Sequence, residues 1–162
     1  MSDQPQAEPE SVRDITTVRV LHAPRELVFC AFRDPQRLAK WWGPNGFTNS
    51  FREFDFREGG NWRFTMKGPD GVEYPNENVF VEVTPPERIT LKHVSNPQFQ
   101  LTITLDQPLD KPEERTKIGW RMLFNTAAER DSVKKIVVPT NEQNLDRLEA
   151  ELAAMAPQEN RR

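Results

Sequence analysis

Cysteine, histidine and long apolar runs are scarce in this 162-residue sequence. The single cysteine, Cys30, cannot form an internal disulfide, and its place in the apolar stretch 27–32 predicts a small buried side chain rather than a catalytic thiolate. His22 and His93 lie far apart, so the sequence offers no typical spacing of metal ligands. No stretch approaches the roughly 18 apolar residues that a membrane span requires.

An excess of charge of one sign is also lacking. The formal net charge is −3, and acidic and basic residues alternate along the chain without forming blocks. A nucleic-acid surface would need a clustered basic stripe, so we expect no nucleic-acid partner. The N-terminus has no basic start followed by an apolar core, so we expect no signal peptide. The expected location is therefore the cytoplasm.

Sequence motifs for common chemistries are missing as well. Gly59-Gly60 precedes an alternating segment typical of a strand, so it predicts a hairpin turn and not a phosphate-binding loop. No serine lies in a Gly-x-Ser-x-Gly elbow. We therefore expect neither a metal nor another cofactor, and the sequence contains no recognisable catalytic constellation.

The apolar residues that are present lie between two polar ends. Residues 1–12 are rich in proline, glutamate and glutamine, and residues 157–162 are similar, so both segments are predicted to be disordered tails. The four tryptophans and ten phenylalanines all lie between these ends. The pattern predicts one domain, residues 13–156, with a core large enough to fold without disulfides.

Alternation of apolar and polar residues predicts a sheet. We expect strands at residues 15–21, 62–67, 76–84, 88–94, 99–106 and 116–124, and a further strand around Phe54 and Phe56. The connections between successive strands are short. They favour an antiparallel meander, because parallel neighbours need longer crossovers.

Helical patterns occur in two places. Two short helices are predicted after the first strand, one beginning at Ala23-Pro24 and one after Asp34-Pro35. Near the C-terminus, residues 126–135 predict a short helix capped by Thr126, and Thr140 is predicted to cap a separate final helix. The apolar stripe of that final helix consists of Leu145, Leu148, Leu152 and Met155. It must pack on the inner face of the sheet, which predicts an α+β fold with its helices on one face.

Several short motifs, in this order, resemble a known family. They are Ala23 to Phe29, Trp41-Trp42-Gly43-Pro44, the segment 59–64, Gly68-Pro69-Asp70-Gly71 and the segment 145–148. Over about residues 13 to 155 the chain resembles the Hsp-90 ATPase activator homologue-like proteins of the START-like (SRPBCC, Bet v-like) or helix-grip superfamily. The resemblance implies a curved antiparallel sheet wrapped around a long C-terminal helix, with a cavity between them. The superfamily includes lipid carriers, polyketide cyclases, hormone receptors and co-chaperone domains, so the fold alone does not define the function.

A ligand cavity in such a fold needs apolar lining and a few inward polar groups. We predict that it is formed by the inner face of the sheet, the Trp41-Trp42 turn and the last helix. The predicted ligand-binding residues are Trp41, Trp62, Phe64, Met66, Glu77, Val79, Val81, Leu91, His93, Ile103, Trp120, Met122, Asn144 and Leu148. The alternative is that the apolar members fill a packed core and that Trp41 packs under the sheet.

Two polar residues in that set could carry chemistry. Glu77 shares its strand parity with Val79 and Val81, and His93 shares its parity with Leu91, so both are predicted to face inward. They could contact a ligand or act as an acid/base pair, or they could be ordinary residues at strand ends. Asn141 and Asn144, near the start of the last helix, are weaker candidates of the same kind.

Three functions are compatible with these patterns. The leading hypothesis is binding of a small hydrophobic or aromatic ligand (lipid, polyketide or flavonoid-like) in an internal cavity. The alternatives are a cyclase- or hydrolase-type enzyme that uses Glu77 and His93, and a co-chaperone-like module that stimulates a chaperone ATPase. The resemblance alone does not carry over the last activity, because the eukaryotic activators have an additional domain before this fold.

Overall fold

The computed structural model describes residues 8–160, with side chains as far as Met155. Within this range the strands form one antiparallel sheet in the order β1-β7-β6-β5-β4-β3-β2. The strands are β1 (Asp14–Leu21), β2 (Thr48–Phe54), β3 (Asn61–Lys67), β4 (Glu73–Thr84), β5 (Arg88–His93), β6 (Phe99–Asp106) and β7 (Thr116–Phe124). From β2 to β7 the chain is the predicted meander, and β1 completes the sheet by pairing with β7.

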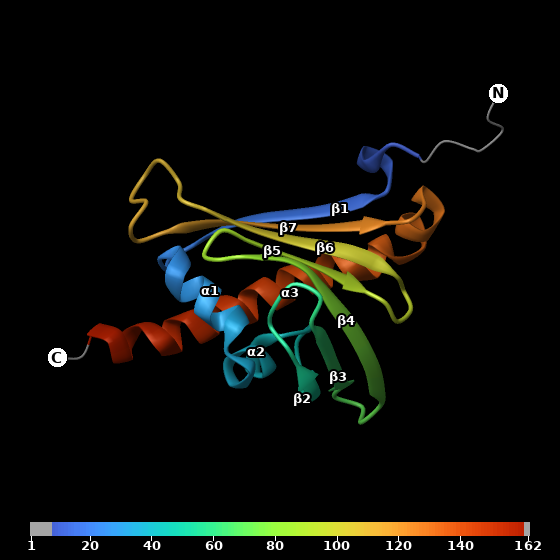
Figure 1. Ribbon diagram of the computed structural model, residues 1–162, viewed down its shortest axis with the longest axis horizontal. Coiled ribbons are helices and arrows are strands. Elements are labelled where there is room, and N and C mark those ends of the chain that lie inside the picture. The colour runs from blue at the N-terminus through green and yellow to red at the C-terminus, as the bar shows by residue number, and fades with distance from the viewer. Residues whose placement is uncertain (1–7, 161–162) are drawn as a thin grey trace.

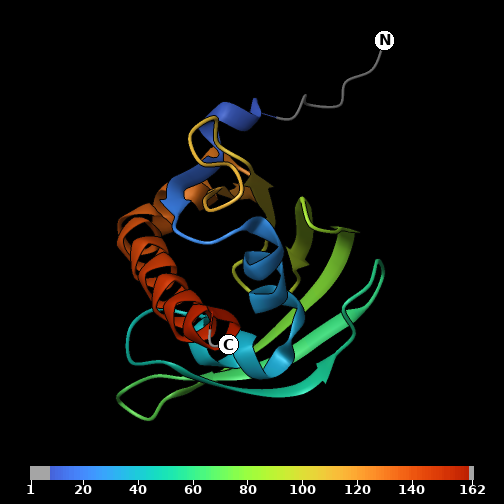
Figure 2. The same cartoon turned by 90° about the vertical axis from the view of Figure 1, so that its left-hand side faces the viewer.

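The helices lie on the inner side of this curved sheet (Figures 1 and 2). They are α1 (Arg25–Arg33), α2 (Pro35–Trp41) and the long α3 (Ala127–Asn160). α3 packs beside β1 at one edge of the sheet, α2 packs beside β2 at the other edge, and α2 contacts α3. The two helices α2 and α3 therefore close the space between the edge strands β1 and β2. The predicted α+β helix-grip fold, with two short helices after the first strand, is confirmed.

The core follows from the alternation of residues in the strands. In β7, Ile118, Trp120, Met122 and Phe124 are buried and alternate with more exposed residues. Their neighbours across the sheet are also apolar, because Ile103 stands opposite Trp120 and Leu101 opposite Met122. The stripe of α3 packs against this face, and Leu145, Leu148, Leu152 and Met155 are all buried as predicted. Cys30 is half-buried against the same core.

The predicted orientation of the first half of β4 is wrong. Val83 stands opposite the buried Ile89, and strict alternation from Val83 would place Val81, Val79 and Glu77 on the inner face. A β-bulge between Phe80 and Glu82 adds one residue and reverses that parity. Asn78 and Phe80 are buried instead, whereas Val81 is 49% exposed.

The two predicted C-terminal helices are a single helix. Thr126 caps it as predicted, because its hydroxyl accepts a hydrogen bond from the backbone N–H of Glu129 at 3.1 Å. Thr140 caps nothing, and its hydroxyl donates to the carbonyls of Ile136 and Val137 inside the helix. Pro139 lies within α3 although proline lacks the N–H that a helix uses. Figure 1 shows a bend between the orange first part of α3 and its red remainder.

Parts of the predicted tails have defined structure. Residues Glu10–Val12 form a turn of 3-10 helix, and the Glu10 carboxylate pairs with Arg121 at 3.0 Å. At the other end α3 continues to Asn160. Residues 1–7 and 161–162 lie outside the described range. None of the described helices is both long enough and apolar enough to cross a membrane.

Candidate ligand-binding site

A cavity of about 180 Å³ lies between α3, the sheet and residues 42–47, which we call the rim loop. The rim loop connects α2 to β2 and places three of its residues at the cavity. The sheet contributes from β3, β6 and β7, and α3 covers the remaining side. The lining residues are Trp42, Gly43, Pro44, Met66, Phe99, Leu101, Trp120, Met122, Val137, Thr140, Asn141 and Asn144.

The aromatic wall of the cavity is centred on Trp42. Its ring lies 5.4 Å from that of Trp120 and 4.9 Å from that of Trp62, measured between centroids. Trp41, the predicted residue, is instead buried in the core, where its indole N–H donates to the carbonyl of Ala31 at 3.0 Å. Trp41 follows Leu38 by three positions, and both face inward on α2. That helical spacing was the signal that could have assigned Trp41 to the core and Trp42 to the rim.

Two asparagines of α3 contribute carboxamide groups to the cavity. Asn141 and Asn144 are separated by three residues, so they lie on the same face of the helix, and both are more than 90% buried. The Asn144 Nδ2 donates to the carbonyl of Trp41 at 2.9 Å, and the Asn141 Nδ2 donates to the Met122 sulfur at 3.4 Å. Both carboxamides line the cavity.

Arg147 fixes the position of the rim loop. Its guanidinium group makes five hydrogen bonds, all to backbone carbonyls at 2.8–3.1 Å: Nη1 donates to Trp42, Gly43 and Pro44, and Nη2 donates to Lys40 and Phe47. Burial lowers the pKa of Arg147, because these carbonyls replace water without adding a negative charge. Arg147 lies outside the apolar stripe of α3, and nothing in the sequence indicates that backbone carbonyls would be its partners.

Gly43 allows the rim loop to approach the sheet closely. Its φ angle of +97° belongs to the region that favours glycine. A Cβ atom on this residue would lie 2.5 Å from the terminal methyl carbon of Met66, a cavity residue. A side chain at Gly43 would therefore have to displace the end of Met66 inside the cavity.

Glu77 and His93 do not form an acid/base pair. Glu77 points to the outer face, where its carboxylate lies 3.4 Å from Arg63. His93 faces inward and is 8% exposed. Its Nδ1 lies 2.7 Å from the Pro97 carbonyl, and its Nε2 lies 2.7 Å from the Asn76 Oδ1. Burial lowers the pKa of His93, although its hydrogen bonds oppose that effect.

The other predicted site residues divide into three groups. Met66, Trp120, Met122 and Asn144 line the cavity. Trp62, Phe64, Leu91, Ile103 and Leu148 are buried in the core but do not line it. Glu77, Val79 and Val81 lie on the outer face of β4. A rim at the Trp41-Trp42 turn was predicted, but the individual lining residues Trp42, Gly43, Pro44, Phe99, Leu101, Val137 and Thr140 were not among the predicted ligand-binding residues.

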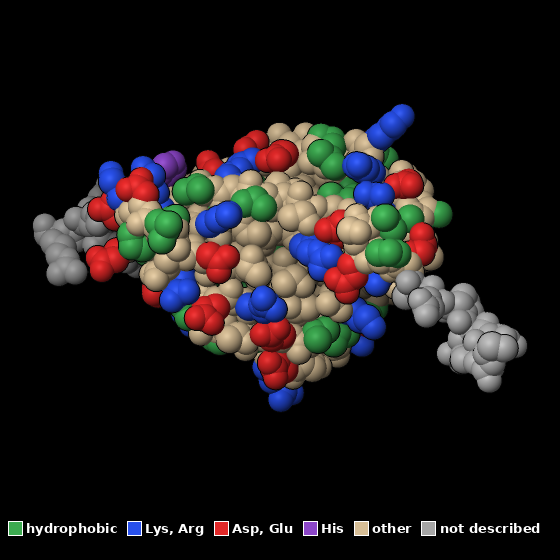
Figure 3. All heavy atoms as spheres, turned by 90° about the horizontal axis from the view of Figure 1, so that it is seen from above, with side chains coloured by type: hydrophobic (Ala, Val, Ile, Leu, Met, Phe, Trp, Pro, Cys, Tyr) green, Lys and Arg blue, Asp and Glu red, His purple; other side chains and the backbone are tan. Residues whose placement is uncertain are grey.

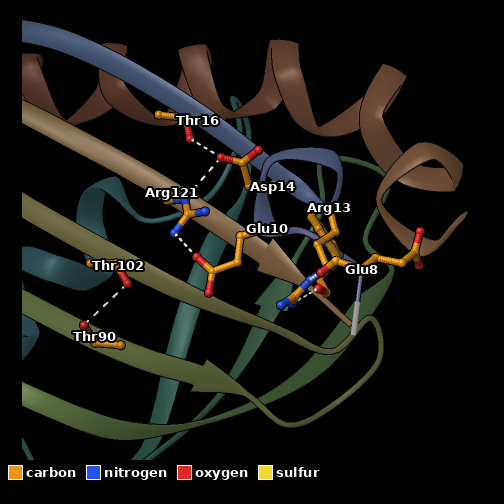
Figure 4. Close-up of polar contacts among 9 residues, drawn as sticks. Glu8, Glu10, Arg13, Asp14, Thr16, Thr90, Thr102 and Arg121 are labelled. Carbon is orange, nitrogen blue, oxygen red and sulfur yellow. Dashed lines mark hydrogen bonds and ion pairs between the residues drawn. The ribbon is translucent and has the colours of Figure 1, made fainter. Parts of the chain in front are cut away.

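A larger hollow of about 420 Å³ lies on the outer face of the sheet. Figure 3 shows that basic and acidic side chains are intermixed on this side of the molecule. Among the residues at this hollow, Arg121 is already paired with Asp14 at 3.1 Å and with Glu10 at 3.0 Å (Figure 4). Lys117 stands opposite Asp106 in the register. Because the hollow is lined by several charged side chains whereas the lining beneath α3 is mainly apolar, we assign the candidate site to the cavity beneath α3.

The fold and the cavity together define a helix-grip protein with a small apolar chamber under its C-terminal helix. Solved structures share this architecture. A protein from Nitrosomonas europaea is 23% identical, with a TM-score of 0.80 over 91% of this chain and 99% of its own. A protein from Chromobacterium violaceum is 30% identical, with a TM-score of 0.71 over 85% and 95% of the two chains.

The family itself is identified by sequence. The model of the family described as "Activator of Hsp90 ATPase homolog 1-like protein" matches residues 22–153. This chain belongs to that family. A Silicibacter pomeroyi protein named AHSA1 has the same fold, with 21% identity and a TM-score of 0.69 over 88% of this chain and 99% of its own. Among curated proteins, no sequence matches.

Proposed function

We propose that this protein binds a small, uncharged, apolar or aromatic molecule in the cavity beneath α3. The observation that carries the proposal is the cavity's lining, which includes no ionisable side chain among the described residues. Such a lining favours the removal of apolar surface from water and gives a buried charge no partner. A carboxylate ligand would therefore lose hydration on entry without gaining an opposite charge.

The volume of the cavity narrows the ligand class further. Drug-sized ligands occupy pockets of roughly 300–1,000 Å³, whereas an apolar cavity of about 150 Å³ can hold benzene. The volume of about 180 Å³ therefore suits a molecule built on one ring. Lipid, polyketide or flavonoid-like ligands would fit only after the rim loop moved outward.

Titration of tryptophan fluorescence with three probes tests the proposal, because Trp42 and Trp120 line the cavity. We expect a saturable response to p-xylene, a weaker one to a flavonoid and none to a medium-chain fatty acid at neutral pH. Val137→Phe should fill the cavity and abolish the response. Val138→Phe, one residue away and 41% exposed, is the matched control and should leave the response unchanged. A p-xylene response that is equal in both variants, or the absence of a response to every uncharged aromatic probe, would refute the proposal.

Family membership favours a second candidate, interaction with a chaperone whose ATPase the protein would stimulate. This candidate is supported by the family's description alone. An ATPase assay with an Hsp90-type chaperone, with and without this protein, tests it. Stimulation that saturates with protein concentration would support the interaction, and an unchanged ATPase rate would exclude stimulation of that chaperone.

A further inference from the structure

We infer that the ligand of the cavity carries a hydroxyl group on its ring and belongs to the phenol class. The inference rests on the proposed function, because it specifies what the cavity recognises. It starts from Asn141 and Asn144, two carboxamides buried on the otherwise apolar inner face of α3. Asparagine has a lower helix propensity than leucine, and burial of its amide opposes folding unless the amide is bonded. Asn144 satisfies the carbonyl of Trp41 at the end of α2, but Asn141 bonds only a thioether, so packing of α3 gives no comparable reason for Asn141.

The hydrogen bonds of the two carboxamides fix their orientations. The carbonyl of Trp41 can only accept, so the atom of Asn144 that faces it at 2.9 Å is the donor Nδ2. The Met122 thioether is likewise an acceptor, so the Asn141 Nδ2 faces it at 3.4 Å. Within the described residues neither Oδ1 atom accepts a hydrogen bond. Since both carboxamides belong to residues that line the cavity, we take these two oxygens as the acceptors offered to a donor on the ligand.

Unused donors are present as well. Trp42 and Trp120 line the cavity, and neither indole N–H donates a hydrogen bond to any residue in the described part of the chain. A hydroxyl group can donate to a carboxamide oxygen and accept from an indole N–H at the same time. Neither a pure hydrocarbon nor an ether offers both. A hydroxyl is also neutral, as the uncharged lining requires, and one ring that bears it suits the volume of about 180 Å³.

The test compares two probes of nearly equal shape, p-cresol and p-xylene, which differ by a hydroxyl in place of a methyl group. Their affinities are measured by calorimetry with the full chain and with Asn141→Leu. We expect the preference for p-cresol over p-xylene to fall roughly fivefold to tenfold in Asn141→Leu, as the loss of one hydrogen bond predicts. Gln36→Met removes an exposed carboxamide from α2, outside the cavity lining, and should keep the wild-type preference.

Further readouts separate the possible outcomes. Asn141→Leu should unfold at an equal or higher temperature than the wild type, because a residue retained for recognition is not needed for packing. The ether 4-methylanisole can accept a hydrogen bond but cannot donate one. Its affinity for the wild type should therefore not exceed that of p-xylene. If p-cresol and p-xylene both bind, but the ratio of their affinities is the same in the wild type and in Asn141→Leu, the hydroxyl inference is overturned and the proposed function stands. If neither probe binds, the proposed function is overturned too.

Discussion

Replacing Arg147 should loosen the rim loop and destabilise the protein. Its five hydrogen bonds hold residues 40–47 against α3. A hydrogen bond to a charged group contributes about 1.5–3 kcal/mol, but bonds from one group are not additive, and the freed carbonyls at the surface can bind water. We therefore expect Arg147→Met to lower the free energy of unfolding by about 2–4 kcal/mol, less than the sum of five bonds.

Arg147→Lys distinguishes geometry from charge. Lysine keeps the positive charge but has a single ammonium group, which cannot reproduce the planar fork that spans five carbonyls. We expect it to recover less than half of the stability lost in Arg147→Met. If charge alone mattered, Arg147→Lys would behave like the wild type.

Urea denaturation measures both effects. With a slope of about 1–3 kcal/mol per molar, a loss of about 3 kcal/mol moves the midpoint by at least about 1 M. Lys134→Met is the matched control, because it removes one positive charge from an exposed position on the same helix. Equal midpoints for Arg147→Met and Lys134→Met would refute the reasoning. The rim loop would then be held mainly by Asn49, which donates to the Trp42 carbonyl, and by Gln143, which accepts from the Asn45 N–H.

Three further predictions concern single residues. Gly43→Ala and Gly59→Ala both place alanine at a positive φ and should each cost about 1–2 kcal/mol in urea denaturation. Only Gly43→Ala should also weaken p-xylene binding, because nothing lies within 4 Å of a Cβ at Gly59; equal binding would contradict the role of Met66. The pKa of His93 is lowered from 6.5, so the unfolded state binds its proton more readily and stability falls as the pH drops below about 6.5. In His93→Gln, the free energy of unfolding should fall less between pH 7.5 and pH 5 than it does in the wild type. An unchanged pH profile would contradict this role of His93. Leu148→Ala should reduce the free energy of unfolding by about 2–5 kcal/mol in urea, because Leu148 is fully buried, and a loss below about 1 kcal/mol would contradict tight packing of α3.

The sheet and the docking face of α3 were predictable because both depend on local periodicity. β6 and β7 have the predicted bounds, and the stripe from Leu145 to Met155 packs as expected. Alternation no longer predicts which face a strand residue occupies when a β-bulge inserts one extra residue and the sequence gives no sign of it. The bulge at Val81 lies in the segment 79–83, where valine occupies every second position, and no single valine indicates which face it occupies. As a result Glu77 was assigned to the wrong face.

Tertiary contacts explain the other differences. Pro139 reads as a helix boundary in the sequence, yet α3 continues through it, because residues on both sides of it pack against the same domain. Val133 and Val137 precede the proline and Leu145 follows it. The pairing of β1 with β7 and the contacts of Arg147 with the rim loop join residues about a hundred positions apart. No pattern within one segment carries that information.

The most direct test of ligand binding in the cavity is an NMR titration of methionine methyl groups with p-cresol. Met66 and Met122 line the cavity, whereas Met155 is buried farther along α3 and serves as the internal control. We expect saturable shifts and intermolecular contacts to the methyl groups of Met66 and Met122, with the Met155 signal unchanged. Unchanged Met66 and Met122 signals at saturating p-cresol, or equal shifts at Met155, would contradict it.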